Sequence, residues 1–101
     1  MSEQKTLTKD EIDSFVSQHS DWAFESDRLV TNYSLKDFDE AIEVMNKVVE
    51  VARKIDHHPL MTNVYNRLSF SLCTHSVGDK VTELDVKLAK LLSEIITEIE
   101  K

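Results

Sequence analysis

The chain has 101 residues, of which 41% are hydrophobic and 31% are charged, and its formal net charge is -7 at pH 7. This length predicts a single domain spanning residues 1–101, with roughly 60–68% of the unfolded surface buried on folding. The acidic charge and the lack of a Lys/Arg cluster argue against direct binding to nucleic acid or to a membrane, because contacts with phosphates supply much of that affinity.

The N-terminal segment and the cysteine content both bear on cellular location. The segment MSEQKTLTKDE is polar and lacks the apolar region of a signal peptide. No apolar run approaches the roughly 20 residues needed to cross a bilayer. Cys73 is the only cysteine, which excludes an internal disulfide bond. Together these features predict a cytoplasmic protein.

The first third of the chain predicts a helix followed by a hairpin. Thr8–Glu11 has the form of a capping box and precedes an apolar stripe, which predicts a helix over about 9–19. Apolar residues alternate with others in 22–24 and again in 29–33, on either side of a polar turn. This arrangement predicts a β-hairpin.

A second helix is the most regular predicted element. It begins at Ser34 or Lys36, and from Phe38 to Ile55 apolar residues recur at i, i+3 and i+4 with almost no interruption. We expect it to end at Pro59, because proline lacks a backbone N–H and restricts the residue before it.

The second half of the chain predicts one strand and a third helix. Residues 64–75 alternate between apolar and polar side chains, as in a strand with one face on the core and one in solvent. Such a strand belongs in a sheet covered by helices on one side only. After a loop at 77–80, Thr82–Asp85 forms a second capping signature and predicts a helix to about residue 100.

The last predicted helix has a wide apolar stripe. The stripe covers an arc of roughly 160°, whereas an amphipathic helix of a monomer needs about 100°. The extra width favours packing of one edge against another subunit, although a deeply buried helix also explains it. The residues are Leu84, Leu88, Leu91, Leu92, Ile95, Ile96 and Ile99.

Three histidines and one aspartate are candidate site residues. Neighbours in a helix or strand do not face one pocket, so we expect Pro59 to turn the chain and fan His57 and His58 around the helix end. His75 is expected to close the polar face of the strand. Asp85 lies within the apolar arc of the last helix, which indicates either a helix cap or a site residue.

Residue chemistry alone leaves three interpretations of these histidines. They are surface or satisfied core residues, or they bind a metal such as zinc, although adjacent ligands are unusual and no HExxH spacing exists. In the third interpretation they perform general acid–base chemistry, for which an unperturbed imidazole pKa of about 6.5 is useful.

The spacing of the candidates is specific. The order His57-His58-Pro59, five residues, Tyr65, nine residues, His75, nine residues, Asp85 resembles the signature of the pterin-4a-carbinolamine dehydratases. The resemblance covers nearly the whole chain and includes Trp22, Lys36-Asp37-Phe38, Asn63-Val64 and Thr74. The sequence departs at Arg53, where the family usually has an acidic or otherwise polar titratable residue. A cation near the histidines would disfavour imidazolium.

The resemblance implies an α+β fold, with an antiparallel sheet of three to four strands and three helices packed on one face. It implies a homodimer or homotetramer and a pterin substrate. The implied reaction removes water from a 4a-hydroxytetrahydropterin, the 4a-carbinolamine, to give quinonoid dihydropterin in tetrahydrobiopterin recycling. Neither a metal nor a redox cofactor is implied.

The matched positions imply a role for each candidate residue. His57 and His75 would transfer protons, and His58 would position the pterin and help to polarise its hydroxyl. Asp85 would bind or orient a ring or the substrate. Trp22 would supply an apolar wall for the heterocycle, or lie in the core instead.

A binding module is the alternative function. Relatives of this fold also serve as dimerisation cofactors of a homeodomain transcription factor. In this chain, we expect such a role to use an exposed edge of the last helix around Leu92 and Ile96.

Overall fold

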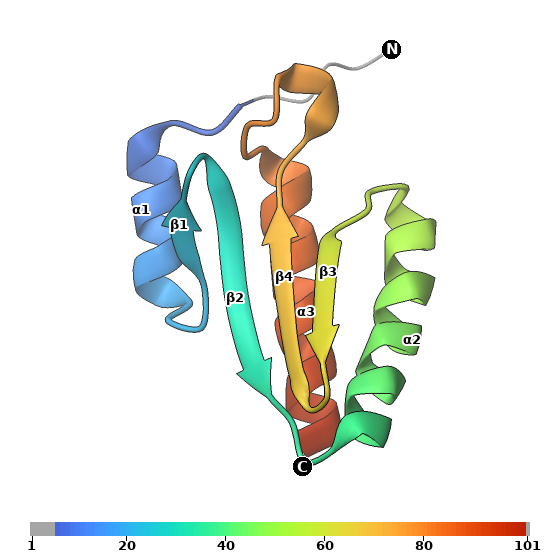
Figure 1. Cartoon of the computed structure of the whole chain (residues 1–101). Helices are drawn as coiled ribbons and strands as arrows, with labels where there is room; N and C mark the ends of the chain where they lie inside the picture. Colours follow the sequence, from blue (N-terminus) through green and yellow to red (C-terminus); the bar gives the residue numbers. More distant parts are fainter. Residues whose placement is uncertain (1–5, 101) are drawn as a thin grey trace.

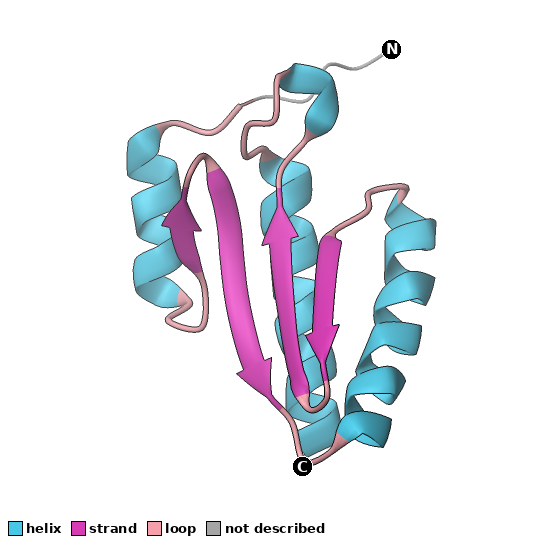
Figure 2. Cartoon of the chain, in the orientation of Figure 1, coloured by secondary structure: helices cyan, strands magenta, loops and turns pink. Residues whose placement is uncertain are grey.

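In the computed structural model, which describes residues 6–100, three helices pack against a four-stranded antiparallel sheet (Figures 1 and 2). Residues 1–5 and 101, and with them the start of the polar N-terminal segment, lie outside the described residues. The predicted α+β class is confirmed. The elements are α1 (Lys9–Gln18), β1 (Ala23–Glu25), β2 (Arg28–Ser34), α2 (Phe38–Ile55), β3 (Leu60–Val64), β4 (Arg67–Leu72), a short 3-10 turn η1 (His75–Val77) and α3 (Glu83–Glu100).

The sheet has the strand order β1-β2-β4-β3, and every neighbouring pair is antiparallel. Register pairs Leu29 with Leu72 and Thr31 with Phe70, so that buried side chains from β2 and β4 share one face. The other face carries polar residues such as Asn32 and Ser69. One-sided covering of the sheet by helices, as predicted from the alternation, is therefore confirmed.

A single buried cluster joins the inner face of the sheet to all three helices. Figure 1 shows α3 running behind β4, with α2 beside it and α1 next to β1. The helix residues in the cluster are Ile12 and Phe15 from α1, Ala41, Val44 and Val48 from α2, and Leu88, Ala89, Leu92 and Ile96 from α3. None of the described helices is long and apolar enough to span a membrane.

The predicted N-terminal helix and hairpin are present. The Thr8 hydroxyl accepts from the Glu11 N–H at 3.1 Å, and the Glu11 carboxylate accepts from the Thr8 N–H at 2.8 Å, which completes the capping box. In the hairpin turn, Ser26 and Asp27 both have positive φ, of 51° and 62°. Two left-handed residues in succession match the twist of the flanking strands.

The predicted limits of α2 are wrong at both ends. The helix begins at Phe38, because the Asp37 carboxylate accepts from the Glu40 N–H at 2.8 Å and so caps it. It ends at Ile55, four residues before Pro59. Asp56 adopts the left-handed conformation, with φ 52° and ψ 46°, and this residue turns the chain out of the helix.

The single strand predicted over 64–75 is wrong. Two strands, β3 and β4, form a hairpin in this part of the chain, and Tyr65 turns between them with φ 54°. The Asn63 side chain holds the turn by donating to the carbonyls of Tyr65 and Arg67. Strand β4 ends at Leu72, so His75 lies in η1 and not on the strand.

The third helix is confirmed, with its capping signature at the N-terminus. The Thr82 N–H donates to the Asp85 carboxylate at 2.8 Å, and the Thr82 hydroxyl accepts from the Leu84 N–H at 3.2 Å. The exposed edge predicted around Leu92 and Ile96 is wrong, because both side chains are buried in the core of the subunit. The oligomer suggested by the wide stripe stays a prediction.

Candidate active site

The candidate residues gather at one end of the molecule. The C-terminal end of α2, the end of β4 and the beginning of α3 all lie at the upper end in Figure 1. His57 and His58 follow α2, His75 follows β4, and Asp85 is in the first turn of α3. Elements that are distant in the sequence therefore bring all four residues to the same end.

The end of α2 determines where His57 points. Because Asp56 is left-handed, the His57 N–H turns back and donates to the Ala52 carbonyl at 3.0 Å. The ring then faces inward, and the side chain is only 10% exposed. Its Nε2 lies 2.6 Å from Asp85 Oδ1. His58, one residue later, is exposed, so the two adjacent rings differ in their surroundings.

Asp85 is fully buried, and both of its carboxylate oxygens are hydrogen-bonded. Oδ1 contacts His57, while Oδ2 accepts from the Thr74 hydroxyl and from the Thr82 N–H, each at 2.8 Å. A buried carboxylate is costly unless it is paired and hydrogen-bonded, as this one is. The sequence left open whether Asp85 is a cap or a site residue, and in the structure it caps α3 and also contacts a candidate histidine.

The contact with Asp85 fixes which ring nitrogen of His57 carries a proton. An ionised carboxylate only accepts hydrogen bonds, so Nε2 must donate to Oδ1. Among residues 6–100, every side-chain nitrogen or oxygen that is buried has a hydrogen-bond partner. Nδ1 has no such partner among the described residues, so it is not buried. Nδ1 therefore reaches solvent. An imidazole anchored at one nitrogen and open at the other is suited to proton transfer.

His75 forms a second imidazole–carboxylate pair. Its Nδ1 lies 2.7 Å from Asp79 Oδ1, and its side chain is 95% exposed. Unlike His57, it points into solvent, and no direct contact joins the two rings within the described part of the chain. The connection between them is indirect, since Thr74 precedes His75 and shares Asp85 with His57.

Two residues at this end were missed by sequence reasoning. Asp79 lies four residues after His75, a spacing that could have suggested a pair had residues 75–77 been predicted as helical. Thr74 had no such signal, because its contact with Asp85 depends on how β4 approaches α3. Arg53, where the sequence departs from the signature, is exposed on α2.

Trp22 occupies the core position that the sequence left open as its alternative role. It is buried, and its indole N–H donates to Ser93 Oγ at 2.9 Å. Ser93 in turn donates to Asp21 Oδ2 at 2.7 Å, and the Tyr33 hydroxyl donates to the same oxygen at 2.6 Å. This network joins the segment just before β1, and strand β2, to α3.

The network shifts the pKa values of its two titratable groups. Burial, and then the hydrogen bond to Asp21, raise the pKa of Tyr33 to about 12. Burial acts to raise the pKa of Asp21, but hydrogen bonds from Tyr33 and Ser93 outweigh it and leave that pKa below its ordinary value. Both shifts favour a neutral phenol beside a charged carboxylate.

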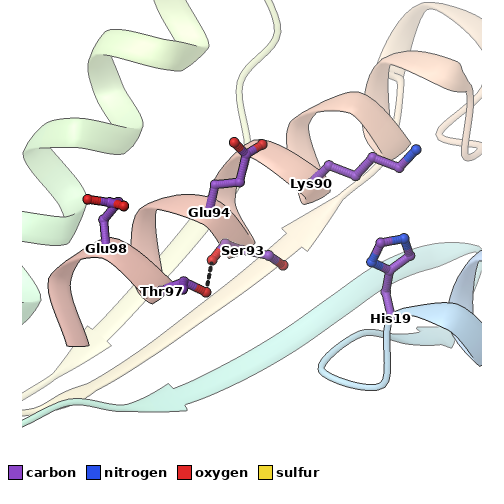
Figure 3. Close-up of a pocket in the computed structure, with 6 residues that line it drawn as sticks. All are labelled: His19, Lys90, Ser93, Glu94, Thr97 and Glu98. Atoms are coloured by element: carbon purple, nitrogen blue, oxygen red, sulfur yellow. Dashed lines mark hydrogen bonds between the residues drawn. The ribbon is translucent and has the colours of Figure 1, made fainter. Parts of the chain in front are cut away.

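A surface depression of about 450 Å³ runs along α3, away from the candidate residues. Figure 3 shows Lys90 and His19 at one end and Glu98 at the other. His19 is half-buried and stacked on Phe15, with ring centroids 4.5 Å apart. None of the three candidate histidines lines this depression. Within residues 6–100, no group of three or more His, Cys, Asp or Glu side chains is placed to hold a metal ion.

Comparisons with known proteins agree on one family. Residues 5–95 match the family model described as "Pterin 4 alpha carbinolamine dehydratase". A protein of Metallosphaera sedula named "Putative pterin-4-alpha-carbinolamine dehydratase" is 42% identical over 89 residues, which are 88% of this chain and 92% of that protein. A protein of the same name from Prochlorococcus marinus is 33% identical over 90 residues, 89% of this chain and 94% of that one.

A solved structure is similar over nearly its full length. The crystal structure of a "transcriptional coactivator/pterin dehydratase" from Brucella melitensis superposes with a TM-score of 0.85 at 33% sequence identity. The match covers 90% of this chain and 98% of that chain.

Proposed function

The chain belongs to the pterin-4a-carbinolamine dehydratase family, and we propose that it removes water from a 4a-hydroxytetrahydropterin by histidine general acid–base catalysis. The product is the quinonoid dihydropterin. We place the reaction in tetrahydrobiopterin recycling and in the cytoplasm.

The reaction requires two proton transfers and no electron transfer. One proton goes to the C4a hydroxyl, which leaves as water when the C4a–O bond breaks. A second proton is removed from N5, whose electrons form the new N5–C4a double bond. Imidazoles titrate near neutral pH and can therefore act in either role.

The observation that carries the proposal is the His57–Asp85 pair. Asp85 anchors Nε2 of His57 at 2.6 Å, and Nδ1 remains open at the surface. We assign Nδ1 of His57 as one proton-transfer atom. A carboxylate behind an imidazole also stabilises the imidazolium that forms when Nδ1 accepts a proton.

His75 is assigned as the second acid–base residue. Asp79 binds its Nδ1, which leaves Nε2 directed to solvent. The two histidines thus use opposite ring nitrogens, each with a carboxylate behind it. We assign the exposed His58 to positioning the pterin and polarising its hydroxyl. Asp85 acts through His57, and we assign no contact with substrate to the buried Trp22.

Histidine replacements test these assignments. We expect His57→Ala and His75→Ala each to lower the dehydration rate of freshly prepared carbinolamine by about 10²-fold or more, the usual contribution of general acid–base groups. His19→Ala is the matched control, because it removes an imidazole that follows the C-terminal end of α1, away from the candidate residues, and it should leave the rate unchanged. A rate that stays at the wild-type level in both site variants would remove the assignment.

A second candidate function is that of a transcriptional cofactor. The Brucella melitensis neighbour carries both roles in its name, and the fold match to it is close. This function needs a surface and not the histidines. We therefore expect His57→Ala to retain binding to the dimerisation segment of a homeodomain factor, measured by calorimetry. If that segment does not bind the wild-type chain, the cofactor role is excluded for that partner.

A further inference from the structure

Beside His57, four polar residues from three parts of the chain form one buried hydrogen-bonded chain. They are His57, Asp85, Thr74 and Thr82, and Asp85 and Thr82 have no exposed surface. The contacts run from Thr82 Oγ1 to Thr74 Oγ1 at 2.7 Å, on to Asp85 Oδ2 at 2.8 Å, and from Asp85 Oδ1 to His57 Nε2 at 2.6 Å. The acid–base assignments above use only the last of these contacts.

The direction of each hydrogen bond follows from the carboxylate at the centre. The ionised Asp85 only accepts, so the single hydroxyl proton of Thr74 must point at Oδ2. Thr74 then has no proton left for Thr82, and Thr82 must donate to Thr74. Thr82 can do so because its other contact, in which its oxygen accepts from the Leu84 N–H, leaves its hydroxyl proton available. The Thr82 and Thr74 hydroxyls therefore both point toward Asp85, and His57 donates to the same carboxylate from the opposite side. Successive hydrogen bonds from Thr82 to Thr74 to Asp85 strengthen one another.

Thr74 also fixes the position of His75 through its backbone. Its backbone N–H donates to the Lys80 carbonyl at 2.8 Å, and the two residues form an isolated β-bridge. His75 is the next residue and opens η1. One threonine therefore holds Asp85 through its side chain and the His75 segment through its backbone.

We propose that Thr74 is a positioning residue. Its side chain holds Asp85 so that His57 keeps its proton on Nε2, and its backbone fixes the position of His75 relative to His57. The proposal rests on the proposed function, in that the histidines it positions are those assigned to proton transfer. Without the Thr74 hydroxyl, Oδ2 loses one of its two donors and the carboxylate is free to rotate away from Nε2.

Three variants separate positioning from simple loss of a buried hydroxyl. Thr74→Val removes the hydroxyl at nearly constant volume, and Thr74→Ser restores it. Thr31→Val is the matched control, because Thr31 is equally buried and its hydroxyl donates to the Asp21 carbonyl, in the Trp22–Ser93 network. It removes the same group from a part of the core that does not contact His57.

The measurements are the ¹⁵N spectrum of the His57 ring, the pH profile of dehydration, and kcat and KM. We expect Thr74→Val to lose the pure Nε2–H signature and to lower kcat by about 10-fold or more with little change in KM, an effect typical of residues that orient a catalytic group. Thr74→Ser and Thr31→Val should keep the wild-type spectrum, pH profile and kcat.

A folded Thr74→Val protein with the wild-type ring spectrum and kcat would overturn the proposal. If that variant does not fold, the wild-type spectrum still decides, since a neutral His57 protonated on Nδ1 would contradict the bonding order. The ring spectrum does not depend on turnover. A wild-type chain without dehydratase activity whose spectrum still responds to Thr74→Val would therefore reject the proposed function and keep the positioning role.

Discussion

Asp85 links helix capping to the candidate chemistry at the scale of a single residue. Its Oδ2 completes the N-terminus of α3, and its Oδ1 holds His57. Its place inside the apolar arc of α3 was visible in the sequence and identified it as either a helix cap or a site residue. The family resemblance implied that it binds or orients a ring or the substrate, but not that the ring is His57 or that Thr74 is a partner, because both come from other elements.

Replacing Asp85 by Asn tests the charge at this position. The amide keeps the shape but cannot stabilise an imidazolium, and it can present its NH₂ group to Nε2. We expect dehydration to slow by about 10²–10⁴-fold, by analogy with the orienting carboxylate of a catalytic triad.

The control for this variant is Asp79→Asn, which neutralises the exposed carboxylate beside His75. Exposed ion pairs contribute about 0–1 kcal/mol, so the free energy of unfolding should barely change. Asp85→Asn should lose about 1–3 kcal/mol, because it leaves buried groups mismatched. Equal losses in urea unfolding would show that the burial of Asp85 has no special energetic role.

Tyr33 gives a pH-dependent prediction. Its pKa is raised from 10.0 to about 12 in the folded protein, so the stabilisation is complete below pH 10 and is lost as pH rises from 10 to 12. Two units correspond to about 2.7 kcal/mol, which solvent screening of a half-exposed ring reduces to about 1 kcal/mol.

The measurement compares the unfolding free energy of the wild type with that of Tyr33→Phe, which has no phenol to ionise. The difference in unfolding free energy between the two proteins should shrink between pH 10 and 12. The titration of lysines affects both proteins equally and so does not contribute to this difference. A difference that is constant over this range would contradict the role of Tyr33 in the network with Asp21.

At the scale of elements, the end of α2 fixes the direction of His57. From the sequence we predicted that the helix ends at Pro59, because proline is the strongest helix-breaking residue in this segment. The structure instead uses Asp56, one of the few non-glycine residues that tolerate the left-handed conformation. A polar residue in that role is hard to distinguish from an ordinary exposed helix residue in one sequence.

Variants at Asp56 test this account of the helix end. A left-handed conformation costs a non-glycine residue about 1–2 kcal/mol, so we expect Asp56→Gly to raise the free energy of unfolding by about 0.5–1 kcal/mol. Asp56→Val should lower it by a similar or larger amount, because a β-branched residue is strained there. Both are measured by urea unfolding. If Asp56→Gly lowered the free energy of unfolding and Asp56→Val left it unchanged, the left-handed turn at Asp56 would not be what ends the helix.

The β3–β4 hairpin was missed for a related reason. The first hairpin has two adjacent turn residues, Ser26 and Asp27, that accept positive φ. In the second, Tyr65 takes the left-handed position, where Gly, Asn or Asp is usual, so the residue with positive φ did not mark a turn between the two strands. The presence of the three helices and of the one-sided sheet was predictable, because periodicity and capping signatures indicate them.

At the scale of the whole molecule, the sheet leaves β3 at an edge. Leu60 and Val64 on this strand are 60% and 65% exposed. An edge strand with apolar side chains and unpaired backbone groups is a template for pairing with another chain. We therefore predict that the homodimer or homotetramer includes contacts through β3.

Sedimentation of the wild type and of a Leu60→Lys/Val64→Lys variant tests this interface. We expect the wild type to sediment as a dimer or tetramer and the variant to shift to a smaller species. Glu43→Lys and Glu50→Lys, exposed on α2, are a control for added positive charge. A wild type that is monomeric at all concentrations would contradict the oligomer, and an unshifted variant would place the interface elsewhere.

The placement of the site as a whole was only partly predictable. The spacing of His57, His75 and Asp85 indicated the chemistry through resemblance to a family. Their meeting at one end depends on the strand order β1-β2-β4-β3, which brings the end of β4 to the start of α3. No local pattern in the sequence encodes that order.

A structure of the assembled protein with a bound, unreactive reduced pterin tests the central claim most directly. We expect C4a and N5 of the pterin to lie within hydrogen-bonding reach of Nδ1 of His57 and Nε2 of His75, with His57 still anchored on Asp85. A pterin bound elsewhere, for example in the depression along α3 beside Ser93 and Lys90, with all three histidines free, would contradict it.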